Sequence, residues 1–270
     1  MTTLDTSTTR LATNVRAPAP AVAIPARRVL TTELRKMFDT RSGFWLIASI
    51  GIAALLATTA VVLFAPDDEL TYGTFAAAFG IPMAVILPII ATLSVTSEWS
   101  QRSGLTTFTL VPHRGRVILA KAEVSVVIGV VSVLLALAVG VVGNLVGAAI
   151  AGVDTVWDMS VSDMLLIVLG NVLGLLVGFM LGVLIRSSAG AIVAYFVYSF
   201  VLPTLSGLLA ASQGWFRDLQ PWVDFNYAQS ALFNGSLTSE QWGQLAVTSA
   251  GWLVLPTALG VWLVMRAEVK

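Results

Sequence analysis

Residues 122–150 read AEVSVVIGVVSVLLALAVGVVGNLVGAAI, an apolar run whose single charged residue, Glu123, lies near its start. An α-helix needs about 20 apolar residues to cross the hydrocarbon core of a bilayer, and this run is longer than that. Hydrophobic residues make up 57% of the whole chain and charged residues only 11%, against about 25% charged residues in a soluble domain. The run therefore predicts a transmembrane helix, and the composition predicts that it has neighbours of the same kind.

Five further segments have similar length and composition. Two of them begin at a capping-box pattern, in which Ser or Thr is followed three residues later by a side chain that can accept a hydrogen bond. These patterns are Ser160-Val161-Ser162-Asp163 and Thr238-Ser239-Glu240-Gln241. We predict an all-α integral membrane protein with six transmembrane helices, at residues 44–65, 75–97, 122–150, 164–185, 189–210 and 244–265.

Basic and acidic residues alternate from one inter-span segment to the next. Cytoplasmic segments of membrane proteins carry an excess of Lys and Arg, so we expect a multi-pass protein of the cytoplasmic (inner) membrane with both termini in the cytoplasm. Arg217 is the one basic residue on the opposite side. The basic set is Arg10, Arg16, Arg27, Arg28, Arg35, Lys36, Arg41, Arg102, Arg114, Arg116, Lys121, Arg186, Arg266 and Lys270, and the acidic set is Asp67, Asp68, Glu69, Asp154, Asp158, Asp163, Asp218, Asp224 and Glu240.

The chain before the first span divides into two parts. Residues 1–28 are rich in Ala, Pro, Thr and Arg and predict a disordered cytoplasmic tail. Residues 29–42 predict an amphipathic helix in the membrane interface, because Leu30, Leu34, Met37 and Phe38 recur at helical spacing. This helix serves as an anchor, as a contact surface for a cytoplasmic partner, or as both. Residues 43–270 form the six-helix transmembrane domain.

The residues that most membrane enzymes and ion-driven carriers need are missing. There is no Cys, His113 is the only His, and the span interiors hold no Asp, Lys, Arg or His. An ionisable residue at mid-bilayer normally marks a proton or ion path, so a proton-coupled carrier and a carboxylate-based intramembrane protease are disfavoured. The phosphate-binding pattern G-x-x-x-x-G-K-[ST] is also absent. We therefore predict that this chain is not an enzyme, binds no cofactor, metal or nucleic acid, and takes any driving energy from another subunit.

Glycines recur at every fourth position along the fourth span. This spacing places them on one helix face, where a neighbouring backbone can approach closely. Packing within the subunit is the favoured interpretation, and an interface between subunits is the alternative. Asn144 and Asn171, near the outer ends of spans three and four, are interpreted as interhelical hydrogen-bonding residues, with substrate contact as the alternative. The glycines are Gly170, Gly174, Gly178 and Gly182.

Prolines and aromatic residues mark the remaining features. Pro82 and Pro88 in span two, Pro203 in span five and Pro256 in span six each favour a kink, because proline lacks the backbone N–H. Residues 211–243 are rich in Trp, Phe and Tyr and predict short helices at the outer interface. A lid over an exit path is the functional alternative for this outer segment.

The loop between spans two and three carries a family resemblance. Residues 96–121 read TSEWSQRSGLTTFTLVPHRGRVILAK, which resembles the permease subunits of type-2 ABC exporters. In those proteins an acidic residue ends span two, and a glycine, a short apolar helix, a proline, a basic residue and a lysine opening span three follow. The matching positions are Glu98, Gly104, Leu110, Pro112, Arg114 and Lys121. Leu105 and Phe108, with Leu110, form a short amphipathic element between Arg102 and Arg114, which docks in a partner or rests on the membrane.

This resemblance implies a six-span permease whose motion is coupled to ATP hydrolysis elsewhere. It implies two separate ATPase subunits, which bind ATP and Mg²⁺, and a second permease subunit that is either a copy of this chain or a related one. Because the spans offer almost no charge, the expected substrate is amphipathic or hydrophobic: a drug, a peptide or a lipid. A membrane scaffold or sensor that transports nothing is the alternative function.

One face of span five is the candidate transport path. Its residues lie at helical spacing on one side, and hydroxyl groups have no favourable reason to face lipid. They either bond to adjacent helices or line a central cavity opposite Phe79 and Met83 of span two. The resemblance favours a lining role, because spans two and five commonly border the pathway in this family. The face comprises Tyr195, Tyr198, Ser199, Leu202 and Ser206.

Overall fold

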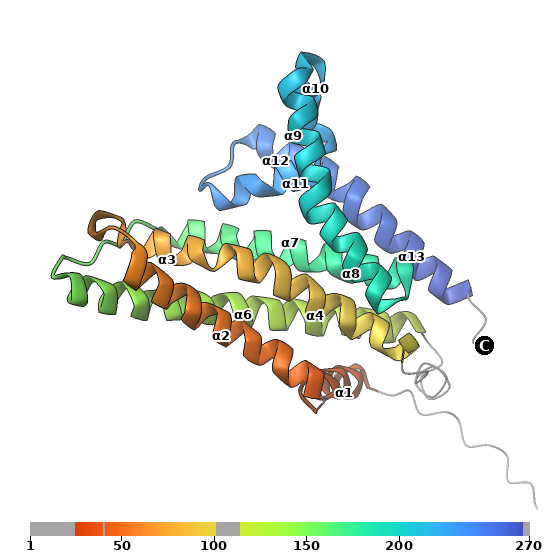
Figure 1. Cartoon of the computed structure of the whole chain (residues 1–270). Helices are drawn as coiled ribbons and strands as arrows, with labels where there is room; N and C mark the ends of the chain where they lie inside the picture. Colours follow the sequence, from red (N-terminus) through yellow and green to blue (C-terminus); the bar gives the residue numbers. More distant parts are fainter. Residues whose placement is uncertain (1–24, 40, 101–113, 267–270) are drawn as a thin grey trace, which may run out of the picture.

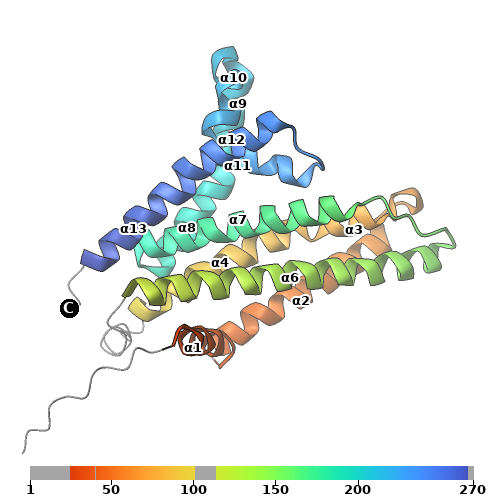
Figure 2. The ribbon, with the colours of Figure 1, turned by 180° about the vertical axis from the view of Figure 1, so that it is seen from behind.

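The computed structural model describes residues 25–39, 41–100 and 114–266, and these residues form an all-α membrane protein. Six of its helices are long and apolar enough to cross a bilayer, as predicted. Four spans lie side by side in an elongated bundle, and the last two leave it obliquely and converge near short helices at one tip (Figures 1 and 2).

The four bundled spans are built from five helices. The first span is α2 (Arg41–Phe64), the third is α6 (Arg114–Ala151) and the fourth is α7 (Val161–Ile185). The second is divided into α3 (Tyr72–Ala78) and α4 (Gly80–Ser100). A one-turn helix, η1 (Asp67–Glu69), precedes α3.

Pro82 predicts a kink in span two, but the division into two helices goes beyond that prediction, because the apolar pattern runs through the span without interruption. Phe79 separates α3 from α4. Pro82 lies four residues after Ala78 and has no N–H to donate to that carbonyl, so the hydrogen-bond ladder is interrupted here. Pro88, by contrast, lies inside the continuous helix α4.

Spans five and six each consist of two α-helices joined by a π-helical turn. Span five is α8 (Ser188–Phe196), η2 (Val197–Val201) and α9 (Leu202–Ser212). Span six is α12 (Ser239–Ser249), η4 (Ala250–Val254) and α13 (Leu255–Arg266). Between these spans lie α10 (Gly214–Val223), α11 (Phe225–Ser230) and η3 (Ala231–Phe233), which confirms the predicted short outer helices.

Each of the two π-turns ends at the first residue of the same four-residue motif. Val-Leu-Pro-Thr occupies residues 201–204 and again residues 254–257. The proline of each motif cannot donate to the preceding turn, and the threonine that follows adds a side-chain hydrogen bond to that turn. Thr204 Oγ1 donates to the Phe200 carbonyl at 2.7 Å, and Thr257 Oγ1 donates to the Leu253 carbonyl at 2.6 Å. The predicted proline kinks in these two spans therefore take the form of π-turns, which often mark functional positions.

Both predicted capping boxes are present. Ser160 Oγ accepts from the Asp163 N–H while the Asp163 carboxylate accepts from the Ser160 N–H, at the start of α7. Thr238 and Gln241 form the same reciprocal pair at the start of α12. These local bonds explain why both helices begin within a few residues of the predicted positions.

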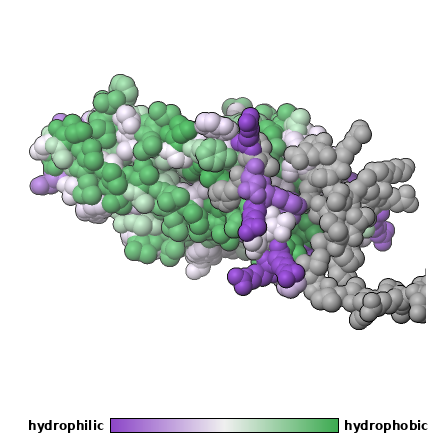
Figure 3. Space-filling model, turned by 90° about the horizontal axis from the view of Figure 1, so that it is seen from below, coloured by the Kyte–Doolittle hydropathy of each residue, from purple (hydrophilic) through white to green (hydrophobic). Residues whose placement is uncertain are grey.

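The N-terminal helix α1 (Ala26–Asp39) is shifted from its predicted range of 29–42. Val29 and Glu33 are buried, and Met37 packs against the core, whereas Leu34 is exposed. The face that α1 turns toward the bundle is therefore one position away from the predicted apolar face. Seen from below, the bundle surface is mainly hydrophobic, and hydrophilic residues gather toward the end where α1 lies (Figure 3). Residues 1–24 of the predicted tail lie outside the described residues.

The glycine ladder of α7 packs within the subunit against two different neighbours. A Cβ atom added at Gly178 would collide with the Pro88 carbonyl oxygen of α4, and one added at Gly182 would lie 3.1 Å from the Thr92 carbonyl oxygen. Closer to the start of α7, a Cβ atom at Gly170 would lie 2.6 Å from the ring of Phe233. The ladder thus brings both α4 and the outer segment close to α7.

Candidate functional site

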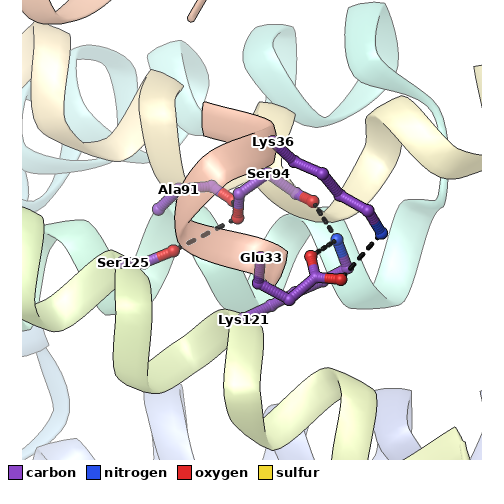
Figure 4. A network of polar contacts seen from close by, with 6 residues as sticks. All are labelled: Glu33, Lys36, Ala91, Ser94, Lys121 and Ser125. Atoms are coloured by element: carbon purple, nitrogen blue, oxygen red, sulfur yellow. Dashed lines mark hydrogen bonds and ion pairs between the residues drawn. The ribbon is translucent and has the colours of Figure 1, made fainter. Parts of the chain in front are cut away.

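A buried ion pair joins α1 to the third span. Lys121 Nζ of α6 lies 2.6 Å from Glu33 Oε2 of α1, and both side chains are only 6% exposed. Lys121 Nζ also donates to the Ser94 carbonyl of α4 at 3.0 Å, and Lys36 Nζ lies 2.7 Å from Glu33 Oε1. Figure 4 shows Lys121 between Glu33 and the Ser94 carbonyl. One ammonium group therefore connects three helices.

Ser94 of α4 makes further polar contacts next to the ion pair. Ser94 Oγ donates to the Ala91 carbonyl at 2.7 Å and lies 3.2 Å from Ser125 Oγ of α6. Burial alone would raise the pKa of Glu33, but the charge and hydrogen bond of Lys121, with those of Lys36, outweigh it and hold that pKa below its usual value. Glu33 is therefore a carboxylate at neutral pH.

The structure places only part of the predicted coupling loop. Lys121, the lysine that the resemblance assigns to the opening of span three, is the centre of the ion-pair cluster. Glu98 lies near the end of α4 and Arg114 begins α6, and their side chains lie outside the description. Also outside the described residues are Arg102, Gly104, Leu105, Phe108, Leu110 and Pro112.

Glu33 is a site residue that the sequence reasoning missed. Glu33 does not belong to the apolar face that Leu30, Leu34 and Met37 predict, so this pattern does not indicate it. The available signal was that Glu33 lies between Val29 and Met37 at four-residue spacing, on a helix whose other ionised residues are mostly basic. An acidic residue on the protein-facing side of a basic helix predicts a basic partner.

Two cavities adjoin the candidate path residues, and the larger of these lies between spans two, three and four and residues 232–235 of the outer segment. It measures about 440 Å³ and includes the candidate path residues Phe79 and Met83 in its wall. Asp158, in the loop before α7, and Asn171 of α7 also line it. This cavity has an apolar interior with polar groups from the acidic end of the bundle.

The second cavity lies between spans five and six and the outer helices. It measures about 330 Å³ and is lined by the candidate path residues Tyr198, Leu202 and Ser206, together with Trp252. Tyr198 belongs to η2 and Trp252 to η4, so the two π-turns face each other across it, with ring centroids 6.1 Å apart. Both π-turns end at the start of the repeated Val-Leu-Pro-Thr motif, a sequence feature that the prediction did not use.

The candidate path residues are therefore divided between two cavities. Tyr195 and Ser199 line neither of them. Tyr195 is buried, and its hydroxyl donates to the Ala84 carbonyl of α4 at 2.6 Å. For Tyr195, the stripe therefore forms the predicted hydrogen bond to an adjacent helix and does not line a cavity.

The two asparagines do not form the predicted interhelical hydrogen bonds. Asn144 Nδ2 donates to the Val156 carbonyl in the loop between α6 and α7 at 3.0 Å. Asn171 Nδ2 donates to the Ile167 carbonyl of its own helix at 2.8 Å. The sequence shows that both residues lie in the spans, but it does not show which acceptor is nearest. For Asn144 the nearest acceptor is a loop carbonyl, and for Asn171 it is a carbonyl of its own helix.

Tyr195 and Tyr198 should differ in what their hydroxyl groups contribute to stability. The Tyr198 hydroxyl is buried and, within the described part of the chain, has no hydrogen-bond partner. Tyr195→Phe should lower the free energy of unfolding by about 0.5–1.5 kcal/mol, because the Ala84 carbonyl loses its donor. Tyr198→Phe should change it by less than about 0.5 kcal/mol. Thermal unfolding in one detergent compares the pair, and an equal loss for both would contradict the difference in bonding.

Among the described residues, no three His, Asp or Glu side chains come together in a group that could hold a metal ion.

The sequence was also compared with known proteins. No protein-family model matches the sequence, and no curated protein matches it at a significant level.

Proposed function

We propose that this six-span membrane protein is the permease subunit of an ATP-driven exporter, with its basic end in the cytoplasm. In this proposal the chain forms the substrate pathway and hydrolyses nothing itself. Separate ATPase subunits, each holding ATP and Mg²⁺, dock on the segment between α4 and α6, and a second permease subunit completes the transporter. The substrate is an amphipathic or hydrophobic molecule.

The observation that carries the proposal is that α4 reaches from the ion-pair cluster to the larger cavity. At one end, the Ser94 carbonyl of α4 accepts from Lys121, which also holds α1. Toward the other end, Met83 of α4 lines the cavity, one turn after Phe79. A force applied to α1 or to the start of α6 therefore acts on the helix that forms a cavity wall.

Packing along α4 supports transmission of such a force. Thr92 Oγ1 donates to the Gly178 carbonyl of α7 at 2.8 Å, and Thr96 Oγ1 lies 2.8 Å from Ser188 Oγ of α8. Because α4 is bonded to α6, α7 and α8, a shift of α4 would displace the other spans rather than be absorbed by a loose contact. A scaffold or sensor would use the same cytoplasmic contacts but would show no substrate-dependent hydrolysis.

Coupling is tested by co-expressing the chain with candidate ABC-type ATPase subunits from the same genome, and by measuring co-purification and substrate-stimulated ATP hydrolysis. Leu110→Asp places a charge in the apolar part of the proposed docking element and should reduce co-purification by about tenfold. Val153→Asp, an exposed apolar residue in the loop at the acidic end, is the matched control and should bind normally. Normal assembly and normal stimulation in Leu110→Asp would contradict docking, and assembly without any substrate stimulation would favour the scaffold.

A further inference from the structure

The larger cavity has the chemical features of a binding site for a specific kind of molecule. Its interior is apolar: besides Phe79 and Met83, it is lined by Val133, Ala136 and Leu137 of α6. Four of these five side chains are at most 3% exposed, and Leu137 is 6% exposed. A volume of about 440 Å³ is within the range of small-molecule pockets.

The ionisable side chains that line this cavity are acidic. Asp158 and Asp163 both line it, and no Lys, Arg or His is among the described residues that do so. The Gly73 N–H donates to Asp158 Oδ1 at 2.7 Å, and the Ser160 N–H donates to Asp163 Oδ2 at 2.9 Å. These bonds hold both carboxylates in place and leave one oxygen of each to accept from a ligand.

A third acceptor lies deeper, on the same helix as Asp163. Asn171 is 8% exposed, lines the cavity, and donates through Nδ2 to the Ile167 carbonyl. Its Oδ1 accepts no hydrogen bond from the described part of the chain. Eight residues separate Asn171 from Asp163, which corresponds to about 12 Å along α7. This oxygen is not among the enclosed side-chain atoms that lack a partner, so it is accessible from the cavity and can accept a hydrogen bond from a ligand or water.

We infer that this cavity binds an amphipathic amine. The ammonium group lies between the Asp158 and Asp163 carboxylates, the apolar body packs on Phe79, Met83 and Leu137, and a hydrogen-bond donor at the far end reaches Asn171 Oδ1. The carboxylates select the cation over neutral and anionic analogues, because charge-assisted hydrogen bonds are the stronger ones. As a statement about the transported substrate, this inference rests on the proposed function; as a statement about binding, it stands on the cavity alone.

Binding is measured by calorimetry on the purified full chain in lipid nanodiscs, with empty nanodiscs subtracted. Three probes share one alkyl body: 10-amino-1-decanol, decylamine and 1,10-decanediol. We expect saturable binding of 10-amino-1-decanol at least about tenfold tighter than that of the diol. The Asp158→Asn/Asp163→Asn variant should weaken 10-amino-1-decanol about tenfold, and Asn171→Leu should make it bind no better than decylamine.

Matched controls separate the cavity from general surface charge. Asp154→Asn changes an acidic residue of the same loop that does not line the cavity, and it should leave all affinities unchanged. Gly80→Leu adds a side chain where a Cβ atom meets nothing within 4 Å on the cavity wall, so it should reduce binding at least about tenfold. Gly51→Leu adds the same side chain in equally open space on α2 and should bind normally.

Several results would overturn the inference: no saturable binding of the amines, equal affinity for amine and diol, or equal losses for Asp154→Asn and the double variant. Because the measurement uses no ATPase, such a result would refute the amine site and leave the coupling experiment to judge the proposed function. Conversely, selective amine binding by a chain that recruits no ATPase would support the site and contradict the exporter.

Discussion

Lys121→Ala should be among the most destabilising single substitutions in this protein, with an expected loss of about 3–5 kcal/mol in the free energy of unfolding. The substitution leaves the Glu33 carboxylate buried without its closest cation, 2.6 Å away in the wild type. It also removes the donor to the Ser94 carbonyl. Thermal unfolding in detergent and protease sensitivity of α1 would both report the loss.

Glu123→Ala provides the matched control, because Glu123 is an exposed residue of the same helix two positions away. It should change stability by less than about 0.5 kcal/mol. The double variant Glu33→Leu/Lys121→Leu should be more stable than Lys121→Ala, since replacing both partners with apolar groups removes the uncompensated charge. If Lys121→Ala and Glu123→Ala unfolded alike, the pair would not secure α1.

The same pair predicts a dependence of stability on pH. The pKa of Glu33 is lower in the folded protein than in the unfolded chain, so the carboxylate contributes stability above its unfolded pKa of about 4.3. That contribution is lost as the pH falls through the folded-state pKa. Wild-type protein should therefore lose stability on acidification below about pH 4.3, and Glu33→Gln should lose less over the same interval.

Gly178→Leu should have the second large effect, because α7 has no room for a side chain at this position. A Cβ atom there would collide with the Pro88 carbonyl oxygen and lie 2.7 Å from the Pro88 Cα atom. Backbone atoms cannot rotate away, so α4 and α7 must separate, which also breaks the bond from Thr92 Oγ1 to the Gly178 carbonyl. We expect a loss of at least about 3 kcal/mol, the upper range for overpacking.

Gly174→Leu is the control from the same ladder. A Cβ atom at Gly174 would meet only the end of the Gln229 side chain, at 3.3 Å, and that side chain can move. Its cost should therefore be clearly smaller, at about 1 kcal/mol. Thermal unfolding in detergent compares the stability of the two variants. An equal loss of stability in both would contradict a tighter contact at Gly178, where α7 packs on α4, than at Gly174.

The positions of the spans could be predicted because the information is local. Residues 122–150 are apolar over more than the thickness of a bilayer, and this holds whatever surrounds them. The capping boxes at Ser160 and Thr238 are equally local, since each joins residues three apart. The span boundaries that shifted were those where helix continues beyond the hydrocarbon, as α6 does by beginning at Arg114.

The faces by which the helices meet could not be predicted in the same way. In a membrane every face of a span is apolar, so hydropathy does not distinguish a protein-facing side from a lipid-facing side. The glycine ladder illustrates this, because one uniform pattern in α7 is divided between α4 and the outer segment. The candidate path residues were likewise predicted to form one stripe, but the Tyr195 hydroxyl donates to α4 whereas Tyr198, in the π-turn of span five, lines the second cavity.

The sequence by itself determined the all-α architecture, the six spans, the short outer helices and the asymmetry of charge between the two ends. Only the tertiary structure determined that Glu33 and Lys121, distant in the chain, form one buried pair. It also determined that Phe79 and Met83 share a cavity with Asp158 and Asn171. Length and hydropathy act on each segment separately, whereas these contacts depend on the angles at which whole helices cross.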